Sequence, residues 1–185
     1  MKKTIFVLAF LLFFFTITAS LAVVTQEKAS EEQIISVIEA NSFAYCCIPH
    51  KGPFTETEKV MIQLMQALRS QNIYPAGAPI GIFYNSPAEV RPEDLEWEIG
   101  FPITPQVNVQ PPLKKKIWEF TRVVSTLHKG PFEKTEDTYS RIFEWMQENG
   151  LELAGPVLER YLTMPSPETK PEDMKAEIWV PCRKK

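Results

Sequence analysis

The five-residue sequence His-Lys-Gly-Pro-Phe occurs twice in this chain, and this repetition constrains the fold more than any other feature. The copies begin at His50 and His128, which are the two histidines of the chain. A shift of 78 residues superimposes the copies. Further segments align as well: Thr57-Glu58 with Thr135-Glu136, Ala76-Gly77 with Ala154-Gly155, and, after one additional residue, Pro92-Glu93-Asp94 with Pro171-Glu172-Asp173. Such self-similarity indicates an internal duplication, and two copies are too few for a solenoid, so we expect one pseudo-symmetric domain.

Each copy predicts the same series of elements, namely a strand, a helix and two further strands. Apolar residues recur at helical spacing after each motif, and segments rich in aromatic and β-branched residues predict the strands. Asn72 and Gly150 align at the expected helix ends, and both readily adopt the left-handed conformation that ends a helix. The predicted strands are 34–38, 43–49, 80–84 and 95–101 for the first copy and 113–118, 122–127, 157–162 and 175–180 for the second.

The two repeats span residues 33–103 and 113–183, and the linker 104–112 contains three prolines and no charged side chain. One helix covers only one face of so small a sheet, so each repeat exposes apolar surface that the other must cover. The predicted fold class is therefore α+β, with two pseudo-symmetric strand-helix-strand-strand repeats and antiparallel sheets around a central ligand cleft.

The start of the chain is typical of an export signal, because two lysines precede an uncharged apolar run from Ile5 to Ala19. The small residues Ser20 and Ala22 predict cleavage after residue 22. An uncleaved membrane anchor is the alternative, because the apolar stretch up to residue 24 reaches about 20 residues, which is enough to span a bilayer. In both cases the remainder is expected outside the cytoplasm, secreted, periplasmic or tethered to the membrane, with residues 23–32 as a flexible segment.

Charge and cysteine content exclude several classes of function. The net charge is −3, and the one basic cluster is Lys114 to Lys116, so nucleic acid is not an expected partner. We expect no metal or cofactor, because the histidines lie in separate copies and the three cysteines lack the spacing of zinc ligands. An oxidising compartment would allow one disulfide from Cys182 to Cys46 or Cys47, although an odd number of cysteines fits no regular framework.

Glu159 is the strongest candidate for a functional residue. Alternation along its predicted strand places Glu159 and Tyr161 on one face, and their counterparts in the first copy are Gly81 and Phe83. An acid in an apolar, aromatic cleft is costly to ionise unless a cation or a donor contacts it, which suits a cation receptor or a general acid/base with a raised pKa. The alternative is a solvent-facing Glu on an edge strand that pairs with Arg160 or a lysine.

Aromatic side chains are the second set of candidates, because they bind flat or cationic ligands by stacking and cation–π attraction. Tyr161 and Phe83 are favoured because they share the face of Glu159 and Gly81, and Trp179 follows because it replaces a glycine of the first copy. Most of the others are expected in the core. The set comprises Tyr45, Phe83, Tyr84, Trp97, Trp118, Tyr161 and Trp179.

Two further acids, Glu98 and Glu177, occupy equivalent positions near the ends of the last strands. If both face the cleft, they supply with Glu159 the general acid and base of a hydrolysis. Alternation along a half-exposed strand explains them equally well. Nucleophilic catalysis has little support, because no Ser or Cys lies in a nucleophile-elbow sequence.

The order of these motifs resembles the GyrI-like small-molecule-binding domains, which include the effector-binding domains of AraC-type and BmrR-like regulators, built from two SHS2 units. The similar segments are the two motif-then-helix units, "GAPIGIFYNSP" and "GPVLERYLTMP", and the strand ends "EIGFPI" and "EIWVPC". The resemblance covers about residues 33–183 and implies a hydrophobic, aromatic-lined cleft between two fused units. It also implies that Glu159, which matches the family's Glu at this position, lines the ligand site.

This sequence departs from the regulators because it carries an apparent export signal and no helix-turn-helix pattern, so a transcriptional role is not expected. The leading hypothesis is an exported domain that binds a lipophilic or cationic small molecule through Glu159, Tyr161, Phe83, Gly81 and Trp179. The rival is a hydrolase of electrophilic small molecules with Glu159 as general acid/base. A third hypothesis is a structural or partner-binding domain whose cleft is filled by its own side chains.

Overall fold

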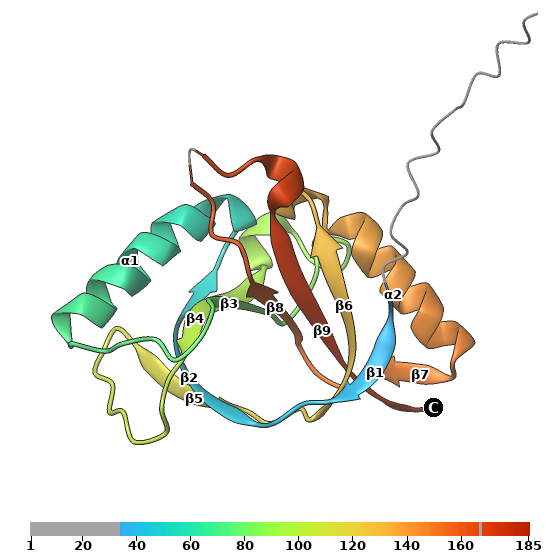
Figure 1. Cartoon of the computed structure of the whole chain (residues 1–185), viewed down its shortest axis with the longest axis horizontal. Helices are drawn as coiled ribbons and strands as arrows, with labels where there is room; N and C mark the ends of the chain where they lie inside the picture. Colours follow the sequence, from blue (N-terminus) through green and yellow to red (C-terminus); the bar gives the residue numbers. More distant parts are fainter. Residues whose placement is uncertain (1–33, 167) are drawn as a thin grey trace, which may run out of the picture. The chain divides into compact units, whose positions relative to one another are not determined.

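The computed structural model describes residues 34–166 and 168–185 (Figure 1). The predicted signal peptide or anchor at 1–22 and the predicted flexible segment at 23–32 lie outside these residues. No helix within the described residues has the length and apolar character needed to cross a membrane.

The fold is α+β, as the sequence predicts, and each half contains one long helix. The first half comprises β1 (Ser36–Glu39), β2 (Phe43–Lys51), α1 (Thr57–Ser70), β3 (Ile80–Phe83) and β4 (Glu96–Pro102). The second half comprises β5 (Lys114–Trp118), β6 (Arg122–Lys129), α2 (Glu136–Glu148), β7 (Leu151–Leu153), β8 (Val157–Tyr161) and β9 (Lys175–Lys184). The short β7 was not predicted; it pairs with the end of β9, which extends four residues beyond its predicted limit.

All strands of the described residues belong to one antiparallel arrangement with the order β1-β6-β9-β8-β3-β4-β2-β5, and β7 pairs beside this path with β9. The separate sheets expected for the two repeats are therefore joined, because β3 of the first half pairs directly with β8 of the second. On each side of this junction the strands follow the same order, β3-β4-β2 and β8-β9-β6.

The strand ahead of each repeat pairs with the other repeat rather than with its own. β1 pairs with β6, and β5 pairs with β2. The two pairings share one alignment, in which Ser36 lies opposite Ser125 and Phe43 lies opposite Trp118. Each half therefore contributes one strand to the sheet of the other, which ties the halves together.

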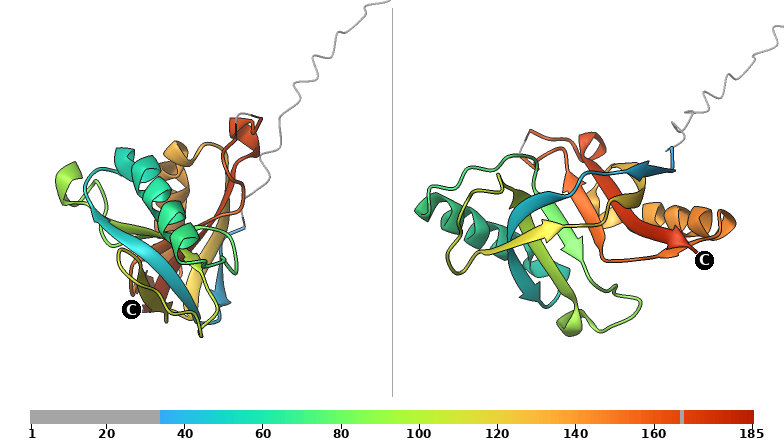
Figure 2. Two further views of the ribbon diagram at one scale, coloured as in Figure 1. Left: turned by 90° about the vertical axis from the view of Figure 1, so that its left-hand side faces the viewer. Right: turned by 90° about the horizontal axis from the view of Figure 1, so that it is seen from below.

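Both helices cover the same face of the sheet, which we call the helix face. A row of paired residues, Ile99, Gly81, Glu159 and Ile178, runs across the sheet from the first half to the second. Ile99 packs in the cluster of α1 and Ile178 in the cluster of α2, so both ends of the row lie under a helix. Figures 1 and 2 show the helices on one side of the sheet, with β3 and β8 between them.

The opposite face, which we call the inner face, packs against itself. Side chains of β3, β8 and β9, including Ile82, Leu158 and Trp179, form one buried cluster with Tyr45 of β2 and Trp118 of β5. The sheet must curve for these strands to meet, because β2 and β9 are not neighbours in it. The inner face is therefore a core shared by both halves.

The repeated motif forms the turn between a strand and a helix in each half. Gly52 and Gly130 have φ angles of 144° and 121°, which favour glycine. Asn72 and Gly150, at φ 54° and 63°, adopt the left-handed conformation predicted for the helix ends. The positive φ angle shared by the two turns explains the glycines of the motif, but the two histidines differ in their surroundings.

The three cysteines are buried and free. Cys46 packs in the α1 cluster, Cys47 in the inner-face cluster and Cys182 in the α2 cluster. The disulfide considered from the sequence is therefore absent, because its partners lie in different parts of the core.

Candidate ligand site at Glu159

Glu159 lies at the centre of β8, on the helix face and between the two helices. It is paired with Gly81 of β3 on one side and with Ile178 of β9 on the other. Its exposed fraction is 5%, so the carboxyl group is buried rather than on a solvent-facing edge. The structure thus differs from the alternative of an exposed Glu, because β8 is a central strand with a neighbour on each side.

Two tyrosine hydroxyls contact the Glu159 carboxyl group. The Tyr139 hydroxyl, from α2, donates a hydrogen bond of 2.6 Å to Oε1, and the Tyr161 hydroxyl also interacts with the carboxylate. Burial raises the pKa of Glu159, and both tyrosines and His128 act in the opposite direction. Burial also raises the pKa of Tyr139 and of Tyr161 well above the ordinary value, so both hydroxyls keep their protons and act as donors.

Glu159 lacks an ion-pair partner among the lysines and arginines of the described part of the chain. No Lys or Arg of the described residues forms an ion pair with it. His128 is buried and bound elsewhere, with Nδ1 2.8 Å from Thr138 Oγ1 and Nε2 3.1 Å from the carbonyl oxygen of Pro131. The site therefore holds a carboxyl group that is met by hydroxyl donors but not neutralised by a neighbouring cation.

Gly81 makes room for Tyr161. A Cβ atom at this position would lie 2.8 Å from the Tyr161 hydroxyl and 3.0 Å from the ring of Phe83. The absence of a side chain thus lets Tyr161 lie across β3, next to the carboxyl group. The expected gap opposite Glu159 exists in the backbone, but Tyr161 and Phe83 occupy it and close the site over Glu159.

The phenylalanines of the repeated motif form the apolar walls of this site. Phe54 packs edge-on against Phe83 with ring centroids 5.3 Å apart, and Phe132 packs against Tyr161 at 5.0 Å. Both pairs are related by the 78-residue shift, so the walls are pseudo-symmetric. The repeated motif therefore contributes aromatic side chains to the site through its phenylalanines, whereas in the sequence its histidines are the more prominent residues.

The structure brings together Glu159, Tyr161, Phe83 and Gly81, but not Trp179. Trp179 is paired with Leu158 and lies on the inner face, where the Arg160 guanidinium stacks 4.3 Å from its ring centroid. Of the other aromatic candidates, Tyr45 and Trp118 also lie in the inner core, and Trp97 packs in the α1 cluster.

The hypothesis of a three-carboxylate site is wrong, because Glu98 and Glu177 lie on the inner face. Glu98 is paired with Ile82, and Glu177 is paired with Arg160. Each acid is therefore one residue away from the row that contains Glu159, so its side chain lies on the opposite face of the sheet. Each acid has its own cation: Lys116 Nζ lies 2.5 Å from Glu98 Oε2, and Arg160 Nη1 lies 3.1 Å from Glu177 Oε2.

Tyr139 is the site residue that we did not single out from the sequence. Its helical spacing with Ile142 and Met146 indicates that Tyr139 belongs to the buried face of α2. Whether its hydroxyl contacts Glu159 depends on where the helix lies over β8, and the sequence does not give this position. One feature of the sequence could have identified Tyr139. The 78-residue shift aligns Tyr139 with Met61, so the second copy has a polar group where the first has an apolar one, just as Glu159 is aligned with Gly81. No group of three His, Cys, Asp or Glu side chains suited to a metal ion occurs in the described part of the chain.

The fold is thus an α+β domain with two similar halves and a buried acid between its helices. The sequence profile of the GyrI-like small molecule binding domain matches residues 33–183, and the chain belongs to this family. A search of curated proteins finds no match.

Solved structures share this fold at low sequence identity. The EcmrR C-terminal domain superimposes with a TM-score of 0.73 at 15% identity, covering 83% of this chain and 99% of that one. The chain spans 58% of the EcmrR chain in a complex with DNA. A hydrolase from Listeria innocua superimposes with a TM-score of 0.64 at 16% identity, covering 80% of this chain and 91% of that one. SAV2435 bound to tetraphenylphosphonium gives a TM-score of 0.51 at 10% identity, with 81% and 94% covered.

Proposed function

We propose that this protein binds a lipophilic or cationic small molecule on the helix face, with Glu159 as the receptor for the charged group. The observation that carries the proposal is a carboxyl group 5% exposed, without a cation partner among the described residues and walled by aromatic rings. The family's description as a small-molecule-binding domain supports the general class of ligand.

The physical reason is the cost of ionising a buried acid. A carboxylate that loses its hydration is stable only if a countercharge or several hydrogen bonds replace the water. Tyr139 and Tyr161 supply donors, and a bound cation would supply the missing charge. The rings of Phe83 and Tyr161 would attract the same cation through their faces. Because Tyr161 covers Glu159, its side chain must move for a ligand to reach the carboxylate.

The place of action that we propose is outside the cytoplasm. The support is the sequence of residues 1–22, with two lysines ahead of an apolar run. Mass spectrometry of the protein from a fractionated cell tests this. A mature form that starts after Ala22 supports export, a full-length form in the membrane fraction supports an anchor, and a full-length form in the cytoplasm would contradict both.

A thermal-shift titration with tetraphenylphosphonium tests the ligand proposal. At a ligand concentration of about 100 times Kd, binding stabilises the folded state by about 2.7 kcal/mol. In a domain of this size that raises Tm by roughly 5–10 °C. We expect Glu159→Gln to abolish most of this increase, because Gln keeps the shape and loses the charge.

Glu177→Gln is the matched control, because it removes a carboxylate from the inner face. It should leave the increase in Tm unchanged. An equal increase in wild type and Glu159→Gln would show that Glu159 is not the cation receptor. No increase with tetraphenylphosphonium or other lipophilic cations would favour the structural hypothesis.

A hydrolase is the second candidate, because the Tyr139 hydroxyl lies 2.6 Å from Glu159. A carboxyl group with a raised pKa can act as a general acid or base toward an electrophilic small molecule or its attacking water, and a second positioned donor can stabilise the charge that develops. The test is turnover of a strained-ring electrophile, followed by mass spectrometry, in wild type, Glu159→Gln and Tyr139→Phe. Turnover that persists in Glu159→Gln would refute a catalytic role for Glu159.

A further inference from the structure

A pair of buried polar side chains, His128 and Thr138, lies beside the Glu159 site, between β6 and the first turn of α2. The Nδ1 atom of His128 lies 2.8 Å from the Thr138 hydroxyl oxygen. Its Nε2 atom lies 3.1 Å from the carbonyl oxygen of Pro131, which can only accept a hydrogen bond. Both ring nitrogens are therefore used within the fold, and neither is offered to a ligand.

The side chain of Thr138 links the start of α2 to the sheet. The N-cap residue of this helix, Thr135, forms no side-chain hydrogen bond with the first turn. Thr138 lies in that turn and contacts His128 of β6, and Arg141, one turn later, donates a hydrogen bond of 3.2 Å to the same hydroxyl oxygen. A directional contact thus joins the first turn of α2 to β6, in addition to apolar packing.

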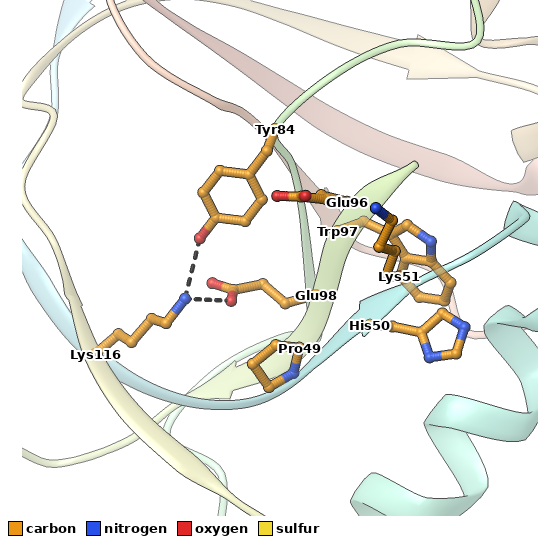
Figure 3. Close-up of a pocket in the computed structure, with 8 residues that line it drawn as sticks. All are labelled: Pro49, His50, Lys51, Tyr84, Glu96, Trp97, Glu98 and Lys116. Atoms are coloured by element: carbon orange, nitrogen blue, oxygen red, sulfur yellow. Dashed lines mark hydrogen bonds and ion pairs between the residues drawn. The ribbon is translucent and has the colours of Figure 1, made fainter. Parts of the chain in front are cut away.

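The first half of the chain has a different contact at the equivalent place. The 78-residue shift aligns His128 with His50 and Thr138 with Val60, which has no hydroxyl group. The Nε2 atom of His50 lies 2.6 Å from Glu56 Oε2, and its ring packs beside Trp97 with ring centroids 4.8 Å apart (Figure 3). The link between the histidine of the motif and the helix therefore belongs to the half that carries Glu159.

Tyr139 follows Thr138 directly, so whatever fixes Thr138 also fixes Tyr139. The backbone N–H groups of both residues donate to the Thr135 carbonyl oxygen at 2.9 Å, which places them in one hydrogen-bonded turn. The Tyr139 hydroxyl lies 2.6 Å from Glu159 Oε1. A displacement of this turn by about 1 Å away from β8 would take the hydroxyl out of hydrogen-bonding range. The contact at Glu159 therefore depends on where the first turn is held.

We propose that Thr138 is a positioning residue of the Glu159 site: its hydrogen bond to His128 holds the first turn of α2 on β6, so that the Tyr139 hydroxyl contacts the carboxyl group. Thr138 acts through Tyr139 and not on the ligand. The importance of this contact for binding rests on the proposed function, but the contact itself can be tested without a ligand.

The test is a ¹³C NMR titration of the Glu159 carboxyl group, which Tyr139, Tyr161 and His128 face. Burial raises the pKa of Glu159 and the Tyr139 hydrogen bond lowers it, so loss of that bond should raise the pKa further. We expect Thr138→Val to raise this pKa, as Tyr139→Phe does, and to add no shift when it is combined with Tyr139→Phe. Thr138→Ser keeps the hydroxyl group and should retain the wild-type titration.

Thr126→Val is the matched control, because it removes a buried threonine hydroxyl that donates from β6 to the Ile34 carbonyl oxygen and not to α2. It should leave the pKa of Glu159 unchanged, even if it lowers Tm.

An unchanged pKa in Thr138→Val would overturn the positioning role. An equal shift with and without the Tyr139 hydroxyl would also overturn it, because His128 would then act on Glu159 directly. Thr138→Ala provides the same comparison if Thr138→Val does not fold. These results leave the ligand proposal untouched, since tetraphenylphosphonium binding to the wild-type protein is measured separately.

Discussion

Tyr139→Phe is the sharpest test of how the Glu159 site is built. The substitution removes one hydroxyl from a buried side chain and leaves its ring, so it deletes the 2.6 Å hydrogen bond to Glu159 with little change in packing. A hydrogen bond to a charged group contributes about 1.5–3 kcal/mol, and one to a neutral group contributes about 1 kcal/mol. The cost of the substitution should therefore depend on whether Glu159 is ionised.

The expected dependence on pH follows from the pKa of Glu159. Burial raises this pKa above the ordinary value of 4.5, so the folded state binds the proton more tightly than the unfolded state. Stability from this group is present below pH 4.5 and is lost as pH rises through the folded pKa. The Tyr139 hydrogen bond lowers the pKa, so its removal raises the pKa further and extends the loss to higher pH.

Urea unfolding at about pH 4 and pH 8 measures both effects. We expect Tyr139→Phe to lower the free energy of unfolding by about 1 kcal/mol at the lower pH and by about 1.5–3 kcal/mol at the higher. A loss of 2 kcal/mol lowers Tm by about 4–8 °C in a domain of this size. Tyr74→Phe is the control, because Tyr74 is 82% exposed. A cost that is the same at both pH values, or no greater than that of Tyr74→Phe, would refute the reasoning.

Three other substitutions probe the site and the core by urea unfolding. Gly81→Ala places a methyl group 2.8 Å from the Tyr161 hydroxyl and should cost about 1–3 kcal/mol through displacement of that side chain. Lys116→Met leaves the buried Glu98 without its cation, and because Lys116 is partly exposed we expect a cost of about 1–3 kcal/mol. Leu158→Ala opens a cavity in the inner core shared by both halves and should cost about 2–5 kcal/mol.

Two matched substitutions control for these effects. The Cβ of Gly77→Ala meets only the Pro102 ring, at 3.3 Å, so a smaller cost than for Gly81→Ala is expected. Lys114→Met removes an exposed charge and should change stability by at most about 0.5 kcal/mol. If each control costs as much as its partner, the contacts of Tyr161 and Glu98 are not the cause of the losses.

Much of this arrangement is predictable from the sequence because two kinds of information combine. Alternation along each strand fixes which side chains share a face, and the 78-residue shift relates Glu159 to Gly81 before any pairing is known. The structure pairs these two residues directly. The left-handed residues at the helix ends are predictable for a local reason, because few residue types tolerate that conformation.

The remainder depends on contacts between segments that are distant in the sequence. Alternation alone does not say that Glu177 and Trp179 face away from Glu159, because that follows from the pairing of Glu159 with Ile178. For the same reason, the sequence does not reveal that β1 and β5 each pair with a strand of the other half. The sequence alone would allow β1 or β5 to pair with a strand of its own half. In the structure β1 pairs with β6 and β5 with β2 in one continuous alignment, and this alignment places each strand in the sheet of the other half.

The pseudo-symmetry also indicates how a ligand would be oriented in the proposed site. Across the axis between β3 and β8, the polar residues Glu159, Tyr161 and Tyr139 correspond to Gly81, Phe83 and Met61. Every hydrogen-bonding group of the site thus belongs to the second half, and the first half offers only apolar surface. A ligand with a cationic end and an apolar end would therefore place the charge against β8 and α2 and the apolar part against Phe83. If the proposed site binds a ligand, its two similar halves with different side chains would favour an amphipathic ligand in one orientation.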